Sequence, residues 1–302
     1  MLLLTIWPLF ALICLGFVLY RKGFPDMGFW SAAERLNYFL LFPALLVASL
    51  ARAPVRDPEV LRLGLAAVVT ILLAFTGFVI ARRLRPTPAA RFGPAVQGAV
   101  RFNTYLGLAI TGSLAGPEGL QRAAVYLAVC VPVVNVLSIL ALTEKGQGRG
   151  VLSLLRAILT NPLILGCLAG LALSISGIGL PFGTDRFLDL LAKSSLPLGL
   201  LCVGAALRPA SMTKDLPVII GNSAIRLGIM PLLAATVGWF FGLQGPEALT
   251  LVVFSAIPTA AASYVLTQQM KGDGTLMAGL VTGQTLIAIV TIPLMLQLLG
   301  LA

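Results

Sequence analysis

Ten apolar segments of about twenty residues follow one another along this chain, and only short connectors separate them. A helix of about 20 mostly apolar residues is long enough to cross the hydrocarbon core of a bilayer. Each segment therefore predicts one membrane-spanning helix. The segments cover residues 1–20, 30–51, 60–81, 92–115, 119–142, 159–177, 187–207, 217–242, 247–269 and 275–300.

The composition supports the same fold class. Hydrophobic residues make up 58% of the 302 residues and charged residues only 11%, whereas soluble domains carry roughly 25% charged residues. A soluble chain of this length has too much surface to hide so many apolar side chains. We therefore expect an all-α integral membrane protein and exclude a cytosolic enzyme, a disordered chain and a secreted disulfide scaffold. The first segment has no basic residues before it and reads as a retained span, not as a cleaved signal peptide.

The net charge of +10 lies mostly in the connectors. Connectors after odd-numbered segments hold thirteen Lys and Arg residues, and those after even-numbered segments hold six. Because basic connectors stay in the cytoplasm, we expect an inner-membrane protein with both termini outside, on the periplasmic side. The cluster from Arg52 to Arg62 argues for the opposite orientation. No segment presents a basic face, so nucleic acid is not an expected partner.

Landmark residues recur in the two halves of the chain. The pairs, separated by 154 or 155 positions, are Pro8 and Pro162, Pro43 and Pro197, and Thr104 and Thr259. They predict a first five-helix repeat at 1–142, a linker at 143–150 and a second repeat at 151–302. Since five is odd, the second repeat enters the membrane inverted, an arrangement typical of secondary transporters. The alternative is a chance alignment of two apolar halves.

Segments 4 and 9 hold helix breakers near their middles. Gly107 weakens segment 4, and Pro258 removes an amide donor from segment 9. Freed backbone groups are tolerated in a membrane only where protein or a water-filled cavity satisfies them. We therefore predict discontinuous helices 4 and 9 that cross near the midplane. Their second halves would begin there from opposite sides, and two helix N-termini favour an anion. The polar side chains beside these breaks, all able to bond a carboxylate, are Asn103, Thr104, Thr259 and Ser263.

Arg101 lies about nine residues into segment 4, roughly 13 Å deep at 1.5 Å per residue. A lone arginine at depth costs at least about 2.5–3.5 kcal/mol, and no acidic residue lies one helical turn away. It either faces a cavity and a substrate anion or extends to the cytoplasmic interface. Arg226 in segment 8 is a second candidate for the cavity, against a structural role. Asn135 and Gln284 are isolated polar residues, read either as helix–helix hydrogen bonds or as ligand contacts.

The other polar residues have simpler predicted positions and pairings. Glu34 and Asn37 lie near the start of segment 2 and are expected at the interface, and Asp189 and Lys193 are expected to pair at i, i+4. The chain has no His, its four Cys lie in apolar segments, and no catalytic or nucleotide-binding motif occurs. We expect no enzyme activity, no catalytic residues, no metal and no cofactor.

The order of several short motifs resembles the auxin efflux carrier family over nearly the whole chain. The motifs are Pro8 to Gly16 with Arg21-Lys-Gly-Phe24, Glu34-Arg-Leu-Asn-Tyr-Phe-Leu-Leu-Phe-Pro-Ala-Leu-Leu46, Arg101-Phe-Asn-Thr-Tyr-Leu-Gly-Leu108, Arg226-Leu-Gly-Ile-Met-Pro231 and Pro258 to Asp273. Two positions depart from the pattern, since many members carry proline where Ala109 and Ala261 stand. The break in segment 4 would then rest on Gly107 and local polarity.

The resemblance implies a ten-helix transporter of small organic anions, mono- or dicarboxylates. It further implies a scaffold of helices 1, 2, 6 and 7 that forms a homodimer. The core of helices 3–5 and 8–10 would carry substrate by an elevator-like motion, in efflux or exchange. The alternatives are a sodium-coupled symporter of the bile-acid-transporter type and a membrane sensor that binds a ligand without moving it. The predicted substrate-binding residues are Arg101, Asn103, Thr104, Gly107, Pro258, Thr259, Ser263, Arg226 and Asn135.

Overall fold

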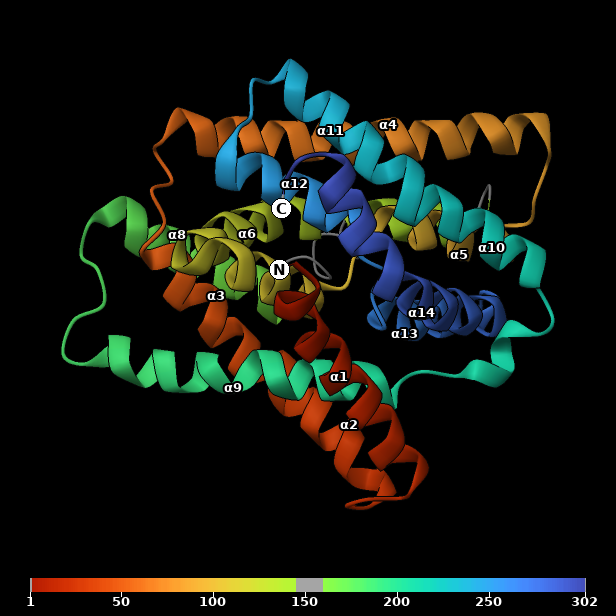
Figure 1. Cartoon of the computed structure of the whole chain (residues 1–302), viewed down its shortest axis with the longest axis horizontal. Helices are drawn as coiled ribbons and strands as arrows, with labels where there is room; N and C mark the ends of the chain where they lie inside the picture. Colours follow the sequence, from red (N-terminus) through yellow and green to blue (C-terminus); the bar gives the residue numbers. More distant parts are fainter. Residues whose placement is uncertain (1, 145–159, 302) are drawn as a thin grey trace.

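Helices occupy all ten apolar segments in the computed structural model, which describes residues 2–144 and 160–301 (Figure 1). Those residues contain no strand. The helices are α1 (Leu2–Arg21), α2 (Met27–Leu36), η1 (Asn37–Leu41), α3 (Phe42–Ala51), α4 (Pro58–Leu84), α5 (Ala89–Val100), α6 (Thr104–Leu142), α8 (Pro162–Ser176), α9 (Thr184–Ala205), η2 (Pro209–Met212), α10 (Leu216–Ala224), η3 (Ile225–Ile229), α11 (Met230–Phe240), α12 (Gly245–Ala256), α13 (Ala262–Gln269) and α14 (Gly274–Leu298).

Seven helical stretches of the described residues are long and apolar enough to cross a bilayer, and α8 and α12 are shorter apolar helices. The expectation of an all-α, multi-pass membrane protein is confirmed. Ten spans and an inverted repeat remain predictions. Most of the proposed linker, residues 145–150, lies outside the described residues.

Both segments predicted to be discontinuous are interrupted. Segment 9 changes from α12 to α13 across residues 257–261, and α12 ends two residues before Pro258, as expected of a residue that lacks an amide donor. Segment 4 changes from α5 to α6 across residues 101–103. A further break inside α6, where Gly116 has a φ of 58°, separates segment 4 from segment 5.

The prediction that Gly107 breaks segment 4 is wrong. Gly107 lies within the first turns of α6 and is helical. The break comes earlier because the side chain of Asn103 accepts a hydrogen bond from the amide of Leu106 and so begins a new helix. Gly107 instead permits close packing, since a Cβ there would lie 2.5 Å from the ring of Phe254.

The helices pack in two groups (Figure 1). One group contains α1, α3, α8 and α9, with α2 beside α9. Glycines let its members approach closely: a Cβ on Gly16 of α1 would lie 2.0 Å from the carbonyl oxygen of Leu201, and one on Gly170 of α8 would lie 3.1 Å from the Cα of Val47. The other group contains α4, α5, α6 and α10 to α14.

Two expected polar contacts are corrected. Asn37 is not at an interface but fully buried, where it exchanges two hydrogen bonds with Ser195 of α9. Asp189 forms an ion pair with Arg52, at 2.8 Å. Because Arg52 follows α3 directly, this pair ties the end of segment 2 to segment 7.

Candidate functional site

The two interrupted segments touch where each one breaks. The amide of Asn103 donates to the carbonyl of Pro258 at 2.9 Å. The hydroxyl of Thr259 donates to the carbonyl of Gln97 in α5 at 2.8 Å. Gln284 of α14 joins both breaks, since it accepts from the amide of Thr259 and donates to the carbonyl of Gly98. The polar backbone freed by the breaks is therefore bonded within the protein.

Arg226 holds the C-terminal ends of α5 and α12 together. Its fully buried guanidinium donates to the carbonyls of Ala99 in α5, at 2.9 Å, and of Phe254 and Ile257, at 2.5 and 2.7 Å. Helix C-termini carry partial negative charge and unpaired carbonyls. One arginine thus satisfies the ends of two helices, which is a structural role.

The N-termini of α6 and α13 lie on another side of the crossing, at a cavity. Asn103 and Thr104 begin α6, and Ala261 and Ala262 begin α13; all four line a small chamber of about 90 Å³. Ala261 offers no side-chain cap to α13. Amide groups at such helix starts carry partial positive charge. This side of the crossing is therefore suited to a negatively charged group.

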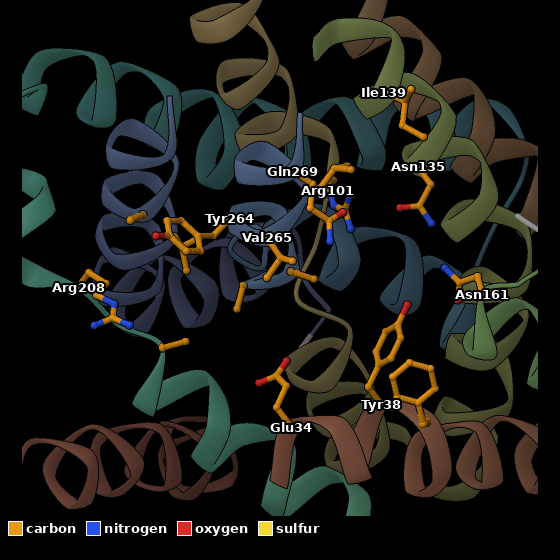
Figure 2. A pocket seen from close by; sticks show the side chains of 17 residues that line it. Glu34, Tyr38, Arg101, Asn135, Ile139, Asn161, Arg208, Tyr264, Val265 and Gln269 are labelled. Carbon is orange, nitrogen blue, oxygen red and sulfur yellow. The ribbon is translucent and has the colours of Figure 1, made fainter. Parts of the chain in front are cut away.

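The chamber is continuous in its lining with a larger cavity of about 580 Å³ (Figure 2). Seven residues line both: Glu34, Tyr38, Arg101, Asn135, Asn161, Ala261 and Ala262. The larger cavity extends past Tyr264 and Val265 to Gln269 and Arg208, near the connectors that follow segments 9 and 7. Its volume is that of a site for a small organic molecule.

Arg101 is the basic group at the inner end of this cavity. Its Nη1 atom is buried and has no hydrogen-bond partner, and Arg101 makes no ion pair with any described residue. The Nδ2 atom of Asn103, two residues along, is likewise buried and has no hydrogen-bond partner in the described part of the chain. Buried donors are costly when they are unsatisfied. An acceptor group in the cavity would relieve that cost.

The predicted site residues separate into two sets. Arg101, Asn103, Thr104 and Asn135 line the cavity. The other five do not line it and belong to the crossing itself: Gly107, Pro258, Thr259, Ser263 and Arg226. Ser263 is fully buried, with its hydroxyl 3.4 Å from that of Thr259.

Several cavity residues were not among those predicted. Glu34 was expected at the interface, yet it lines both cavities together with Tyr38. Their i, i+4 spacing puts them on one helix face, which was an available signal. Asn161 caps α8 through the amides of Leu163 and Ile164, and its position before a proline also marks a helix start.

Comparison with known proteins decides the family. A family model described as "Membrane transport protein" matches residues 1–296. The chain belongs to this family, the auxin efflux carrier family. A relative described as an "Uncharacterized transporter", from Methanothermobacter thermautotrophicus, is 25% identical over 296 residues, which cover 96% of each chain.

Members of this family are membrane transporters and not enzymes. The cavity of this auxin efflux carrier family member is its candidate functional site. Its lining brings together Arg101, which makes no ion pair with a described residue, the acidic Glu34, two helix N-termini and an apolar and aromatic wall.

Proposed function

We propose that this transporter is a secondary carrier of small organic anions, and that Arg101 binds the substrate carboxylate at the crossing. The observation that carries the proposal is the buried Nη1 atom of Arg101, which has no partner and lines the cavity. A carboxylate there would pair with the guanidinium and lie beside the starts of α6 and α13. Asn103, Thr104 and Asn135 supply further hydrogen-bonding groups in this proposal.

We also propose ten spans in two inverted five-helix repeats. Equivalent contacts support it. Adding 154 to Gly16 and Val47 gives Gly170 and Leu201, and the structure packs Gly16 on Leu201 and Gly170 on Val47. Adding 155 to Ala99 gives Phe254, and Arg226 donates to both carbonyls. A chance alignment gives no reason for such paired contacts.

The transport mechanism we propose is elevator-like. The group containing α1, α3, α8 and α9 would be the scaffold, able to form a homodimer in the cell membrane. The group containing α4 to α6 and α10 to α14 would move with the substrate. With both termini outside, the cavity opens toward the cytoplasm, because its outer residues Arg208 and Gln269 adjoin connectors after odd segments.

Reconstitution in liposomes tests the function. We expect currents on a solid-supported membrane, or labelled counterflow where exchange is electroneutral, for a small carboxylate. Arg101→Gln should abolish transport in a folded protein, because it removes the charge that pairs with the carboxylate. Arg62→Gln is the matched control, since Arg62 is an exposed arginine on α4 outside the cavity.

The outcomes separate the alternatives. Wild-type transport by folded Arg101→Gln protein contradicts the assignment. Transport that depends on Na⁺ favours the symporter alternative. If the purified protein binds a carboxylate but neither assay detects transport, the sensor alternative is favoured.

A further inference from the structure

Glu34 places a second, opposite charge in the same cavity as Arg101. Its carboxylate lines both the chamber and the larger cavity. In Figure 2, Glu34 and Tyr38 point into the cavity from one side and Arg101 lies on the other. Glu34 makes no ion pair with any residue that the structure describes, and neither does Arg101. The cavity thus presents an acid and a base that do not satisfy each other.

The remaining groups around the cavity do not cancel the charge of Glu34. Arg208 is the other charged lining residue, and it is exposed, with its guanidinium 5.7 Å from the ring centre of Tyr20. Water screens such an exposed charge. The other ionisable side chains that line the two cavities are the phenols of Tyr38, Tyr105 and Tyr264, and a phenol cannot carry a positive charge.

This charge pattern discriminates between carboxylates. A dicarboxylate bound to Arg101 would bring its second negative charge into the cavity that holds Glu34, and like charges repel strongly where the dielectric constant is low. A monocarboxylate would leave Glu34 unpaired. A carboxylate with a positive group on its other end would pair both charges and keep the filled cavity neutral. The lining of the larger cavity also holds the apolar side chains of Phe39, Ile139, Val265 and Leu266, and in Figure 2 Val265 lies between Arg101 and Glu34.

We propose that Glu34 is the specificity-determining residue of this cavity and selects a zwitterionic substrate of the amino-acid type. The carboxylate end binds Arg101 and the ammonium end binds Glu34. The inference rests on the proposed function for the carboxylate end, and it changes the substrate class from a plain organic anion to a carboxylate that also carries an ammonium group. Repulsion of unmatched partners is how such a site obtains selectivity.

The same pair spans the two helix groups. Glu34 lies on α2, which packs against α9, whereas Arg101 lies at the crossing of the other group. A zwitterion bound to both therefore bridges the groups in this arrangement. Any sliding of one group past the other would separate the ammonium from Glu34 while the carboxylate stays on Arg101.

Matched ligands of equal length test the proposal in liposomes containing the full-length protein. One set is hexanoate, ε-aminohexanoate and adipate, and a shorter set is butyrate, γ-aminobutyrate and succinate. We expect the amino member of at least one set to be transported best by the wild type. In Glu34→Gln, its advantage over the plain monocarboxylate should fall by about tenfold, the effect of losing one charge-assisted hydrogen bond. Glu59→Gln, at an exposed glutamate of α4, is the matched control.

This design distinguishes a wrong role for Glu34 from a wrong role for Arg101. The inference is overturned if monocarboxylates equal or exceed the amino acids in the wild type, or if Glu34→Gln leaves the ratio unchanged. If Arg101→Gln still abolishes transport in that case, the proposed function stands alone. No transport of any of the six compounds by folded wild-type protein overturns both. Folding of each variant is checked by its elution profile and thermal unfolding.

Discussion

The amide of Asn103 donates a hydrogen bond of 2.9 Å to the carbonyl of Pro258, so the breaks in segments 4 and 9 meet at one point. Around that contact the two helix C-termini lie against Arg226 and the two N-termini line the cavity. The helix C-termini at the crossing thus have a structural role, whereas the helix N-termini are accessible to a ligand. Stability and binding should depend on different residues.

Removing the guanidinium of Arg226 should destabilise the protein strongly. Arg226→Met leaves three buried carbonyls without a donor, and each unsatisfied group costs about 1–3 kcal/mol. Arg226→Lys should be intermediate, because an ammonium keeps the charge but lacks the planar fork of donors. Unfolding in detergent measures both. Arg56→Met, which removes one exposed bond to the carbonyl of Ile175, is the control and should be near neutral. Equal midpoints for Arg226→Met and Arg56→Met would contradict the role of Arg226.

Loss of the Thr259 hydroxyl should weaken the crossing without touching the cavity. Thr259→Val keeps the shape of the side chain but removes one of the two donors to the carbonyl of Gln97, which retains its bond from the amide of Arg101. We therefore expect a loss of about 0.5–1.5 kcal/mol in unfolding free energy, the net value of one hydrogen bond. The control is Thr236→Val, an exposed threonine that bonds only to the carbonyl of Leu232 one turn earlier. A fall in stability no larger than that of the control would rule out a role for the hydroxyl.

The close contact between α1 and α9 predicts a steric effect at Gly204. A Cβ there would lie 1.9 Å from the carbonyl oxygen of Ile13, so Gly204→Ala must push the helices apart, at about 1–3 kcal/mol. Gly77 in α4 has no atom within 4 Å of the same position. Gly77→Ala should therefore be neutral or stabilising by up to about 1 kcal/mol, since alanine favours the helix. Thermal unfolding of the two variants side by side decides the point, and the contact is refuted if they behave alike.

Two ion pairs differ in burial, and neutralising the acidic partner of each should change the unfolding free energy by different amounts. Arg122 donates to Glu247 where the two side chains are only 7% and 4% exposed. Glu247→Gln should cost about 1.5–3 kcal/mol, because it removes the buried counter-charge of Arg122 and leaves only Glu118, whose side chain is 55% exposed, at 3.0 Å. Asp189→Asn breaks the pair with Arg52, whose side chains are 44% and 40% exposed, and should cost less than about 1 kcal/mol. Chemical denaturation measures both, and the reverse ranking would be inconsistent with the burial seen here.

Much of the fold could be predicted because the bilayer imposes a length on each apolar segment. Residues 1–20 and 60–81 correspond to α1 and α4 within a few residues, and Pro258 correctly marked a break. Gly107 did not mark the other break, because the position of a helix start depends on the cap that Asn103 forms after the chain has folded. Asparagine is a favoured N-cap residue, so the local sequence did hold a signal for this helix start.

The candidate site was predicted only in part for a similar reason. Arg101 and Asn103 stood out because polar groups are rare within apolar segments. The same reasoning drew attention to Arg226, which satisfies backbone carbonyls and lines no part of the cavity. Glu34, near the start of its segment, looked interfacial by depth alone, although the packing of α2 turns it toward the cavity.

The sequence by itself determined the class of the protein, its apolar segments, and the positions where polar groups must enter the membrane. Those properties follow from hydrophobicity and from the cost of unpaired backbone in lipid, and both are local. Only the tertiary structure decided which polar groups satisfy each other. In it Arg226 bonds to the ends of two helices, whereas Arg101 and Glu34 face one cavity and form no ion pair with any described residue. That division depends on contacts between residues far apart in the chain, which no local pattern encodes.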